Sequence, residues 1–513
     1  MTGARPFLLN LFLAYLFSNH SNFLKKRKDA RINKQIKPMK KHHFFSYLFW
    51  TFIAVSAGII ISSSFVATLK TAKNYANGLN KPFVYEAKGF PLSVVREIGK
   101  ETEKIINRAS RIALGNDFKS ESGNQKEKNE KYITADLDKM ILYLHENGKT
   151  VEKLPILSKG KPGSPWETPV GKYAVLYKEE KHFSSIGKVW MPNSIQFFGN
   201  FFIHGWPYYP DGTPVYEGYS GGCIRLSVSD SKKVYDFADK GTPIYISKQS
   251  NSEIFGNKSY NTLNNNSKKP TLSSKNYLVA DINTGDIILS KNESEQLPIA
   301  SITKLITALI SLETINQEQT TFVPKDATTK NGTGKKDLSE GEVISTGSLL
   351  YPLLLQSSNI ASETLANQIG RQNFIDYMNQ KTSAIGLNKT SFADPSGISE
   401  KNTSTAEDLL KLLSYLFKNK KHILDITKNK SIKDGMKTWV NNDKLADFEN
   451  FLGGKTGQTE AARKTFAGIF SLPLSEFEEK NVGIILLRGE DREDDVLKIL
   501  DYLKDNVYYG TKI

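Results

Sequence analysis

The sequence contains a single cysteine, Cys223, among its 513 residues. One thiol excludes any disulfide within the chain, so the fold has to be stabilised by packing. Apolar side chains are plentiful: hydrophobic residues make up 39% of the chain and include 22 tyrosines and 28 phenylalanines. This composition excludes a chain that is disordered throughout, and the length exceeds that of one ordinary core. We therefore expect two or three domains.

Charged groups are absent from one long apolar run, residues 44–69. A run of this length spans a bilayer with some tilt, and no small-residue cleavage site follows it, which favours an uncleaved anchor over a signal peptide. The preceding segment, residues 1–43, ends in a densely basic stretch, and the positive-inside rule places it in the cytoplasm. The sequence thus predicts a single-pass protein of the cytoplasmic membrane, with its N-terminus inside and extracytoplasmic domains. Met39 is an alternative start.

The formal net charge is +15, a value that is common among nucleic-acid-binding proteins. Here the densest basic run is explained by membrane topology, and the other lysines are scattered among acidic residues. We therefore predict no nucleic-acid binding. An anionic cell-wall polymer is the partner that we expect for the basic exported part.

Two stretches poor in apolar residues divide the exported part. Residues 70–131 end in a polar run and are interpreted as a stalk, and residues 249–275 are rich in Asn, Ser and Lys, as linkers are. Between them, residues 132–248 show short alternating strands and a hairpin signal at Asn147-Gly148, which predicts a mostly β domain. Residues 276–513 have strands at both ends and helices between them, which predicts an α/β domain.

The lone cysteine lies in the stretch Ser220-Gly-Gly-Cys-Ile-Arg225. A thiolate needs a neighbouring base or positive charge to form near neutral pH, and His204 ends an aromatic, strand-like run 19 residues upstream. Glycines beside Cys223 let backbone approach a ligand and free N–H groups for an oxyanion, while the planar fork of Arg225 suits a carboxylate. The alternative is a buried structural cysteine, against which the glycine and arginine neighbours argue.

These residues resemble the L,D-transpeptidase catalytic domain (YkuD type), whose pattern is His-Gly and then, about fifteen residues on, Ser/Thr-x-Gly-Cys-x-Arg or Asn. The resemblance covers residues 132–248. It implies that Cys223 attacks the bond between the third residue and the D-Ala of a peptidoglycan stem peptide, forming a thioester. It also implies that His204 takes the thiol proton and that the Gly205 carbonyl orients its ring.

The same resemblance implies a substrate-binding role for the remaining motif positions, Ser220, Gly222 and Arg225. The sequence departs from the family pattern at two places. Gly221 stands where the family often has His, and Val228 stands where Asn is common.

A second constellation begins with Ser301-Ile-Thr-Lys304 at the start of a predicted helix. This spacing puts both side chains on one face, where a partly deprotonated lysine can accept the serine proton beside a helix N-terminus that favours an oxyanion. Alone, the motif is also a common helix start, with Ser as the N-cap. Ser357-Ser-Asn359 and Lys455-Thr-Gly457 follow in the same chain, and the three motifs in this order are typical of penicillin-binding proteins and class A β-lactamases.

Residues 276–513 resemble the low-molecular-weight penicillin-binding proteins of the D-alanyl-D-alanine carboxypeptidase family, serine peptidase family S11. Roles implied by this resemblance are nucleophile for Ser301, base for Lys304, proton relay for Ser357, substrate amide contact for Asn359, carboxylate recognition for Lys455 and Thr456, and substrate binding for Gly457. The implied oxyanion donors are the backbone N–H groups of Ser301 and Gln458. A Glu-x-x-Leu-Asn stretch is absent between Asn359 and Lys455, which argues against a β-lactamase.

The sequence as a whole predicts a multidomain fold: an N-terminal transmembrane helix, a mostly β L,D-transpeptidase domain, and an α/β penicillin-binding-protein-like (β-lactamase-like) domain. The predicted function is bifunctional remodelling of peptidoglycan stem peptides, with β-lactams as covalent inhibitors and with neither metal nor cofactor. A D,D-carboxypeptidase would make the tetrapeptide donor that the L,D-transpeptidase uses. The alternatives are hydrolysis at both sites, as an L,D-carboxypeptidase and D,D-endopeptidase, or a wall-binding or β-lactam-sensing module without turnover.

Overall fold

The computed structural model describes residues 131–510, except 249–258, 264–267, 330–336 and 477. The predicted basic segment and membrane span, and all but the last residue of the predicted stalk, lie outside the described residues. No helix within the described part of the chain is long and apolar enough to cross a membrane.

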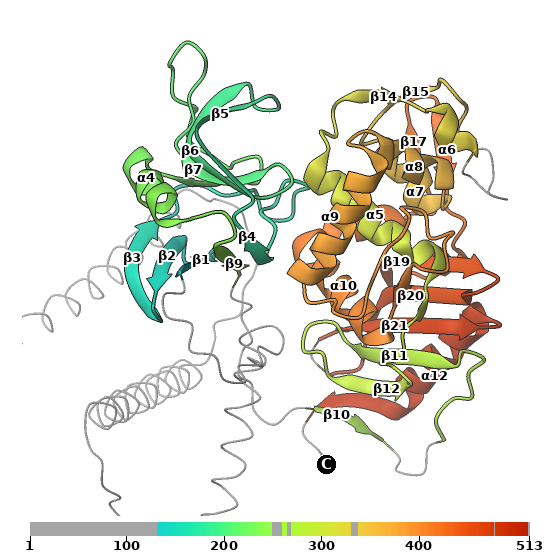
Figure 1. Cartoon of the computed structure of the whole chain (residues 1–513). Coiled ribbons are helices and arrows are strands. Elements are labelled where there is room, and N and C mark those ends of the chain that lie inside the picture. The colour runs from blue at the N-terminus through green and yellow to red at the C-terminus, as the bar shows by residue number, and fades with distance from the viewer. Residues whose placement is uncertain (1–130, 249–258, 264–267, 330–336, 477, 511–513) are drawn as a thin grey trace, which may run out of the picture. The chain divides into compact units, whose positions relative to one another are not determined.

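The first domain consists of two sheets and one helix (Figure 1). Its elements are β1 (Lys131–Asp136), β2 (Ile141–Glu146), β3 (Lys149–Pro155), β4 (Gly171–Ala174), β5 (Tyr177–Ser184), β6 (Val189–Phe198), β7 (Phe201–Gly205), β8 (Ile224–Leu226), α4 (Val228–Phe237) and β9 (Pro243–Ser247). One sheet has the strand order β3-β2-β1-β9-β4 and the other has the order β5-β6-β7-β8. A mostly β domain was predicted here, and the structure has one.

Alternation of apolar and polar side chains builds the first sheet. Ile133 and Ala135 in β1, and Leu142 and Leu144 in β2, are buried while their neighbours are more exposed. The predicted Asn147-Gly148 turn joins β2 to β3, and both residues have positive φ, 54° and 74°. These values suit a two-residue hairpin, which confirms that prediction.

Strands β7 and β8 are the part of this domain that positions the cysteine. All five residues of β7 are buried, and β7 runs parallel to β8 with His204 beside Arg225. A parallel pair requires a crossover connection, and the chain between the two strands, residues 206–223, ends at Cys223. The thiol therefore lies at the entrance to β8.

The second domain is an α/β domain, as predicted, built around a sheet with the order β12-β11-β21-β20-β19. Its strands are β10 (Ser259–Thr262), β11 (Asn276–Asp281), β12 (Ile287–Lys291), β13 (Leu297–Pro298), β14 (Thr320–Phe322), β15 (Val343–Ser345), β16 (Thr403–Ser404), β17 (Ser431–Asp434), β18 (Lys437–Val440), β19 (Phe451–Thr459), β20 (Arg463–Leu472), β21 (Lys480–Gly489) and β22 (Val507–Gly510). Four two-stranded pairs surround the main sheet: β10-β22, β13-β16, β14-β15 and β17-β18.

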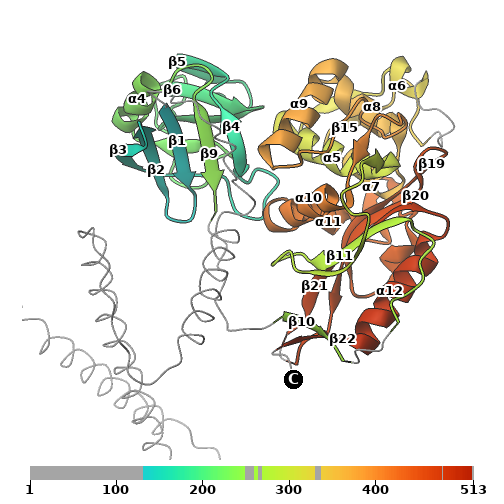
Figure 2. The same ribbon diagram turned by 60° about the horizontal axis from the view of Figure 1, so that its bottom comes forward.

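The helices of the second domain fall into two groups, one packed on the central sheet and one in which helices pack mainly on one another (Figure 2). They are η1 (Ala300–Ile302), α5 (Thr303–Thr314), α6 (Lys325–Thr329), α7 (Leu350–Leu355), α8 (Asn359–Asn367), α9 (Arg371–Ala384), α10 (Ala406–Asn419), α11 (Lys421–Thr427), η2 (Lys444–Asp447) and α12 (Arg492–Asn506). Helix α10 packs on β11, β20 and β21, while α12 packs on β20 and β21 as part of a separate apolar cluster. Because both of their faces are covered, β20 and β21 are buried almost throughout.

The structure differs from the predicted linker at residues 249–275. Residues 259–262 form β10, which pairs antiparallel with β22 at the other end of the domain. The ring of Tyr260 packs against that of Tyr509 at 5.0 Å, and its hydroxyl donates to the Asp281 carboxylate at 2.5 Å. Composition alone predicted a linker because this strand depends on a partner about 250 residues away.

Candidate active sites

The loop before β8 holds Cys223 in a closed turn. Ser220 Oγ donates to the Cys223 carbonyl at 2.6 Å and accepts from the Gly222 N–H at 3.0 Å. Gly222 has φ 107°, and a Cβ on it would lie 2.2 Å from the ring of Phe201. Only glycine fits there, so two of the predicted site residues, Ser220 and Gly222, shape the loop that presents the thiol.

His204 is buried, and its Nδ1 lies 2.6 Å from the Gly205 carbonyl oxygen. A carbonyl only accepts, so Nδ1 carries the proton in this arrangement and Nε2 is left as an acceptor. Gly205 has a second role, because a Cβ on it would lie 2.6 Å from Ser231 Oγ in α4. The contact that the resemblance implied for the Gly205 carbonyl is therefore present.

The pairing of β7 with β8 brings Cys223 close to the strand that carries His204. His204 is paired with Arg225, and Cys223 directly precedes β8. Cys223 Sγ lies 3.7 Å from the backbone oxygen of Asn200, the residue before β7. The thiol therefore lies beside β7, in the strand pair that also holds His204 and Arg225.

Burial keeps the Cys223 and His204 side chains uncharged. It raises the pKa of the Cys223 thiol to about 11, against the opposing effects of a hydrogen bond from the Phe202 backbone and of the Arg225 charge. Burial also lowers the pKa of His204 to about 4, with a smaller opposing effect of the Gly205 hydrogen bond. At neutral pH the resting state is therefore thiol and neutral imidazole.

Arg225 is half-buried beside the thiol. Its guanidinium lies 5.5 Å from the ring centre of Trp206, and Nε is buried without a hydrogen-bond partner among the described residues. An unpaired buried donor costs free energy that an incoming acceptor recovers. This geometry suits the predicted role of Arg225 in holding a substrate carboxylate or carbonyl.

We expect the alkylation of Cys223 by iodoacetamide to lack a plateau at neutral pH. With a thiol pKa of about 11, the logarithm of the rate should rise with a slope of about 1 between pH 6 and pH 10, because only the thiolate reacts. The measurement is mass spectrometry of the intact chain, in which this is the only thiol. A rate already flat between pH 5 and pH 7 would show a resting thiolate-imidazolium pair instead.

The serine site is built around the buried Lys304. Its Nζ lies 2.9 Å from Ser301 Oγ, 2.8 Å from Asn359 Oδ1 and 2.6 Å from the Ser396 carbonyl oxygen. Ser301 belongs to the short helix η1, and Ala300 before it has φ 49°. The structure therefore brings together three of the predicted residues, Ser301, Lys304 and Asn359.

Burial lowers the pKa of Lys304 well below its usual range. The charge of Lys455 lowers it further, while Asp394 and Asp337 oppose these effects. In the neutral amine, Asn359 and Ser396 accept its two N–H groups, and the lone pair then faces Ser301 Oγ. This is the arrangement that a general base for the serine needs.

Ser357 lies on the turn between α7 and α8 with φ 59°, a left-handed conformation that is rare outside glycine and costs about 1 kcal/mol. The next residue, Ser358, caps α8 by accepting from the Ala361 N–H at 3.0 Å. Asn359 is the first residue of α8 and reaches Lys304. The predicted turn before a helix is confirmed, and strain of this kind is common at functional sites.

The third motif lies inside β19, at the edge of the sheet, where a strand approach was predicted. A Cβ on Gly457 would lie 2.8 Å from the Ser301 backbone nitrogen, so glycine allows this strand to approach the nucleophile. Lys455 and Thr456 are buried, and Gln458 is exposed. Burial lowers the pKa of Lys455 to about 8; Asp443 opposes this and the Arg492 charge adds to it.

Three further residues support the serine site and were not predicted. Asp394 accepts hydrogen bonds from the backbone of residues 396, 397 and 399, which fixes the carbonyl that Lys304 contacts. Asn402 joins this loop to Thr303 in α5, and Arg492 Nη1 donates to the Gly457 carbonyl at 2.8 Å. Arg492 lies 35 residues beyond Gly457 in the sequence, and no local motif marks it.

The fold and the serine site together define the penicillin-binding class of serine acyl-transfer domains. The L,D-transpeptidase catalytic domain model matches residues 130–246, and the D-alanyl-D-alanine carboxypeptidase model matches residues 263–470. A solved D-alanyl-D-alanine carboxypeptidase from Mycobacterium tuberculosis aligns with 49% of this chain and 99% of its own, with 26% identity and a TM-score of 0.43.

Among curated proteins, a D-alanyl-D-alanine carboxypeptidase of Mycobacterium tuberculosis is 32% identical over 201 residues, which are 37% of this chain and 68% of that protein. A D-alanyl-D-alanine endopeptidase of Escherichia coli is 33% identical over 150 residues, 28% of this chain and 48% of that protein. The chain belongs to the D-alanyl-D-alanine carboxypeptidase family through its second domain, and it carries an L,D-transpeptidase catalytic domain ahead of it.

We expect Lys304→Met to slow the acylation of Ser301 by a labelled penicillin by about 10² to 10⁴-fold, the range typical of a lost general base. Lys304 Nζ is the amine that contacts Ser301 Oγ, at 2.9 Å. Stopped-flow or gel measurement of the covalent adduct gives the rate. Lys325→Met, at an exposed lysine of the same domain, is the control, and equal rates in both variants would contradict the role of Lys304.

Proposed function

We propose that this chain is a bifunctional peptidoglycan-remodelling enzyme, in which a serine D,D-carboxypeptidase and a cysteine L,D-transpeptidase act in sequence. The observation that carries the proposal is the presence of two separate candidate nucleophile and base sets on one chain, each with a base whose pKa is lowered by burial. The names of the curated relatives support the first activity.

In the serine step, Ser301 Oγ attacks the carbonyl between the two terminal D-Ala residues while its proton moves to Lys304 Nζ. The negative charge on the carbonyl oxygen is stabilised by the backbone N–H groups of Ser301 and Gln458. The C–N bond then breaks, the terminal D-Ala leaves with the proton, and water hydrolyses the ester to release a tetrapeptide. Lys455 and Thr456 hold the terminal carboxylate of the pentapeptide during the attack.

In the cysteine step, Cys223 Sγ attacks the carbonyl of the third residue of the tetrapeptide while His204 Nε2 takes the thiol proton. The fourth residue leaves as D-Ala, taking the proton from His204, and a thioester remains. An amine of a second stem peptide then attacks the thioester, which forms the cross-link and restores the thiol. The neutral resting pair suits this sequence because the charge develops only during attack.

Residues 44–69 anchor the enzyme in the cytoplasmic membrane under this proposal, with both sites on the outer side where stem peptides are exposed. The support is the charge-free run and the basic stretch before it. β-Lactams acylate Ser301 because they mimic the D-Ala-D-Ala end.

The test is to incubate the full chain, purified in detergent, with a disaccharide pentapeptide and to identify products by mass spectrometry. Wild type should give tetrapeptide and then cross-linked dimer, Cys223→Ala should stop at tetrapeptide, and Ser301→Ala should leave pentapeptide. A dimer formed by Ser301→Ala from pentapeptide would contradict the two-step order. A persistent covalent adduct on Ser301 with no released tetrapeptide would favour a sensing role.

A second candidate for the serine site is D,D-endopeptidase activity. Three relatives that are 33% to 37% identical over about 150 residues are named D-alanyl-D-alanine endopeptidases. The chemistry differs only in the leaving group, which is the amine of another stem peptide instead of free D-Ala. Supplying a D,D-cross-linked dimer to the Cys223→Ala chain distinguishes the two: an endopeptidase splits the dimer, and a strict carboxypeptidase leaves it intact.

A further inference from the structure

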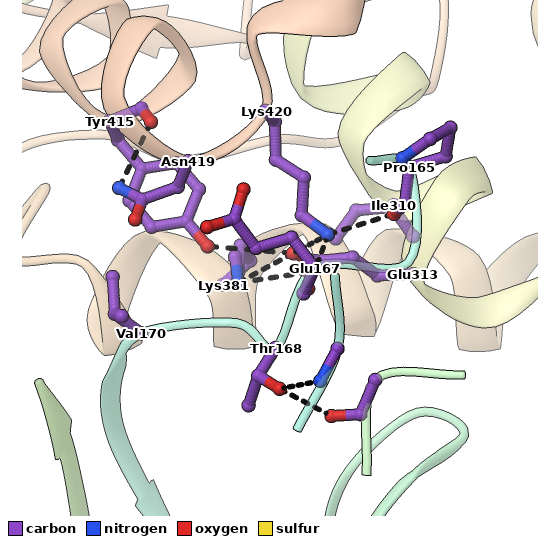
Figure 3. A network of polar contacts seen from close by, with 12 residues as sticks. Pro165, Glu167, Thr168, Val170, Ile310, Glu313, Lys381, Tyr415, Asn419 and Lys420 are labelled. Atoms are coloured by element: carbon purple, nitrogen blue, oxygen red, sulfur yellow. Dashed lines mark hydrogen bonds and ion pairs between the residues drawn. The ribbon is translucent and has the colours of Figure 1, made fainter. Parts of the chain in front are cut away.

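A buried cluster of charged and aromatic residues joins the two domains (Figure 3). Its members, here the Glu313 cluster, are Glu313, Lys381, Tyr415 and Lys420 from the second domain and Tyr173 from the first. The side chains of Glu313, Lys381 and Lys420 are fully buried. Lys381 Nζ lies 2.8 Å from the Glu313 carboxylate and donates to the Tyr173 hydroxyl at 2.9 Å.

The ammonium group of Lys420 donates hydrogen bonds to backbone carbonyls of the first domain. Its Nζ donates to the Pro165 carbonyl at 2.9 Å and to the Glu167 carbonyl at 2.8 Å, and it lies 3.8 Å from the Glu313 carboxylate. Figure 3 shows this ammonium between the two carbonyls and Glu313. Lys381 is closer to the Glu313 carboxylate than Lys420 is. The shortest contacts of Lys420 are therefore its two hydrogen bonds to the first domain.

The segment that Lys420 holds lies against the cysteine loop. Thr168 Oγ1, one residue after Glu167, donates to the Gly222 carbonyl at 2.9 Å and accepts from the Gly160 N–H at 2.9 Å. A Cβ on Gly222 would also lie 3.0 Å from the Trp166 carbonyl oxygen. One side of the loop that presents Cys223 is therefore formed by residues 165–168.

A second connection runs from the end of α5 to the thiol. Asn200 Nδ2 donates to the Thr314 carbonyl at 2.8 Å, and the Asn200 backbone oxygen lies 3.7 Å from Cys223 Sγ. Gly199 has φ 47°, and a Cβ on it would lie 2.8 Å from the Glu313 carbonyl oxygen. The β6-β7 turn thus lies directly on the last residues of α5.

We propose that the second domain completes the cysteine site, with Lys420 as a positioning residue for residues 165–168 and the end of α5 as the support for Asn200. An interface that only tethers two domains needs no contact near either nucleophile. Here both connections end on groups that touch Gly222 or Cys223 Sγ. The catalytic consequence rests on the function proposed above for Cys223, whereas the effect on thiol reactivity does not.

The test compares Lys420→Met with the matched control Lys421→Met, an exposed neighbour, in the full chain. Three rates are measured for each: alkylation of Cys223 by iodoacetamide at pH 7, acylation of Ser301 by labelled penicillin, and formation of cross-linked dimer from tetrapeptide. Removing the ammonium frees residues 165–168, so we expect alkylation to become at least fivefold faster and kcat for dimer formation to fall at least tenfold, with KM within twofold. Penicillin acylation and all three rates of Lys421→Met should stay within twofold of wild type.

Unchanged alkylation in Lys420→Met would overturn the proposal. If alkylation instead reaches the rate of the urea-unfolded chain, Lys420 is needed for folding, and Asn200→Ala then decides: a rise of at least fivefold, still below the unfolded rate, supports the proposal, and no rise overturns it. Absence of dimer in wild type, together with the predicted change in alkylation, would count against the function proposed for Cys223 while leaving the positioning role supported.

Discussion

The complete burial of helix α5 is the constraint on which both candidate sites depend. Every residue from Thr303 to Thr314 is buried, including a lysine at its start and a glutamate near its end. Water is therefore excluded from Lys304 near the start of the helix and from Glu313 near its end. The polar partners of both side chains must then be protein groups. Lys304 lies against uncharged oxygen atoms, and burial lowers its pKa well below the usual range. Glu313 lies close to two lysines, Lys381 and Lys420, at the contact between the two domains.

The chemistry at the two nucleophiles follows the same electrostatic principle on different folds. Desolvation disfavours charge, so burial lowers the pKa of the His204 imidazole to about 4 and that of the Lys304 amine well below its usual range, which favours the form that can accept a proton. Each base then keeps its orientation through a backbone carbonyl, that of Gly205 in one case and that of Ser396 in the other. Backbone oxygens suit this task because they do not titrate and because their positions are fixed by the strands and loops around them.

Much of both sites could be predicted from the sequence, because the motif residues are close in sequence to the turns and strands that position them. The hairpin at Asn147-Gly148 and the contact of the His204 ring with the Gly205 carbonyl are examples. Lys381 and Lys420 could not be predicted as buried, since in sequence they resemble the many exposed lysines of this chain. Their burial depends on residues far away in sequence, such as Tyr173 for Lys381 and Pro165 for Lys420. Strand β10 was missed for the same reason.

The protonated resting state of Cys223 affects how readily the thiol is oxidised. The thiolate is the nucleophile that attacks peroxides and disulfides, far faster than the thiol does, and the oxidation series from sulfenic to sulfonic acid starts from it. A thiol whose pKa lies near 11 presents almost no thiolate to such oxidants, and the chain has no second cysteine to resolve a sulfenic acid as a disulfide. The burial that raises the pKa of this thiol thus also slows its oxidation.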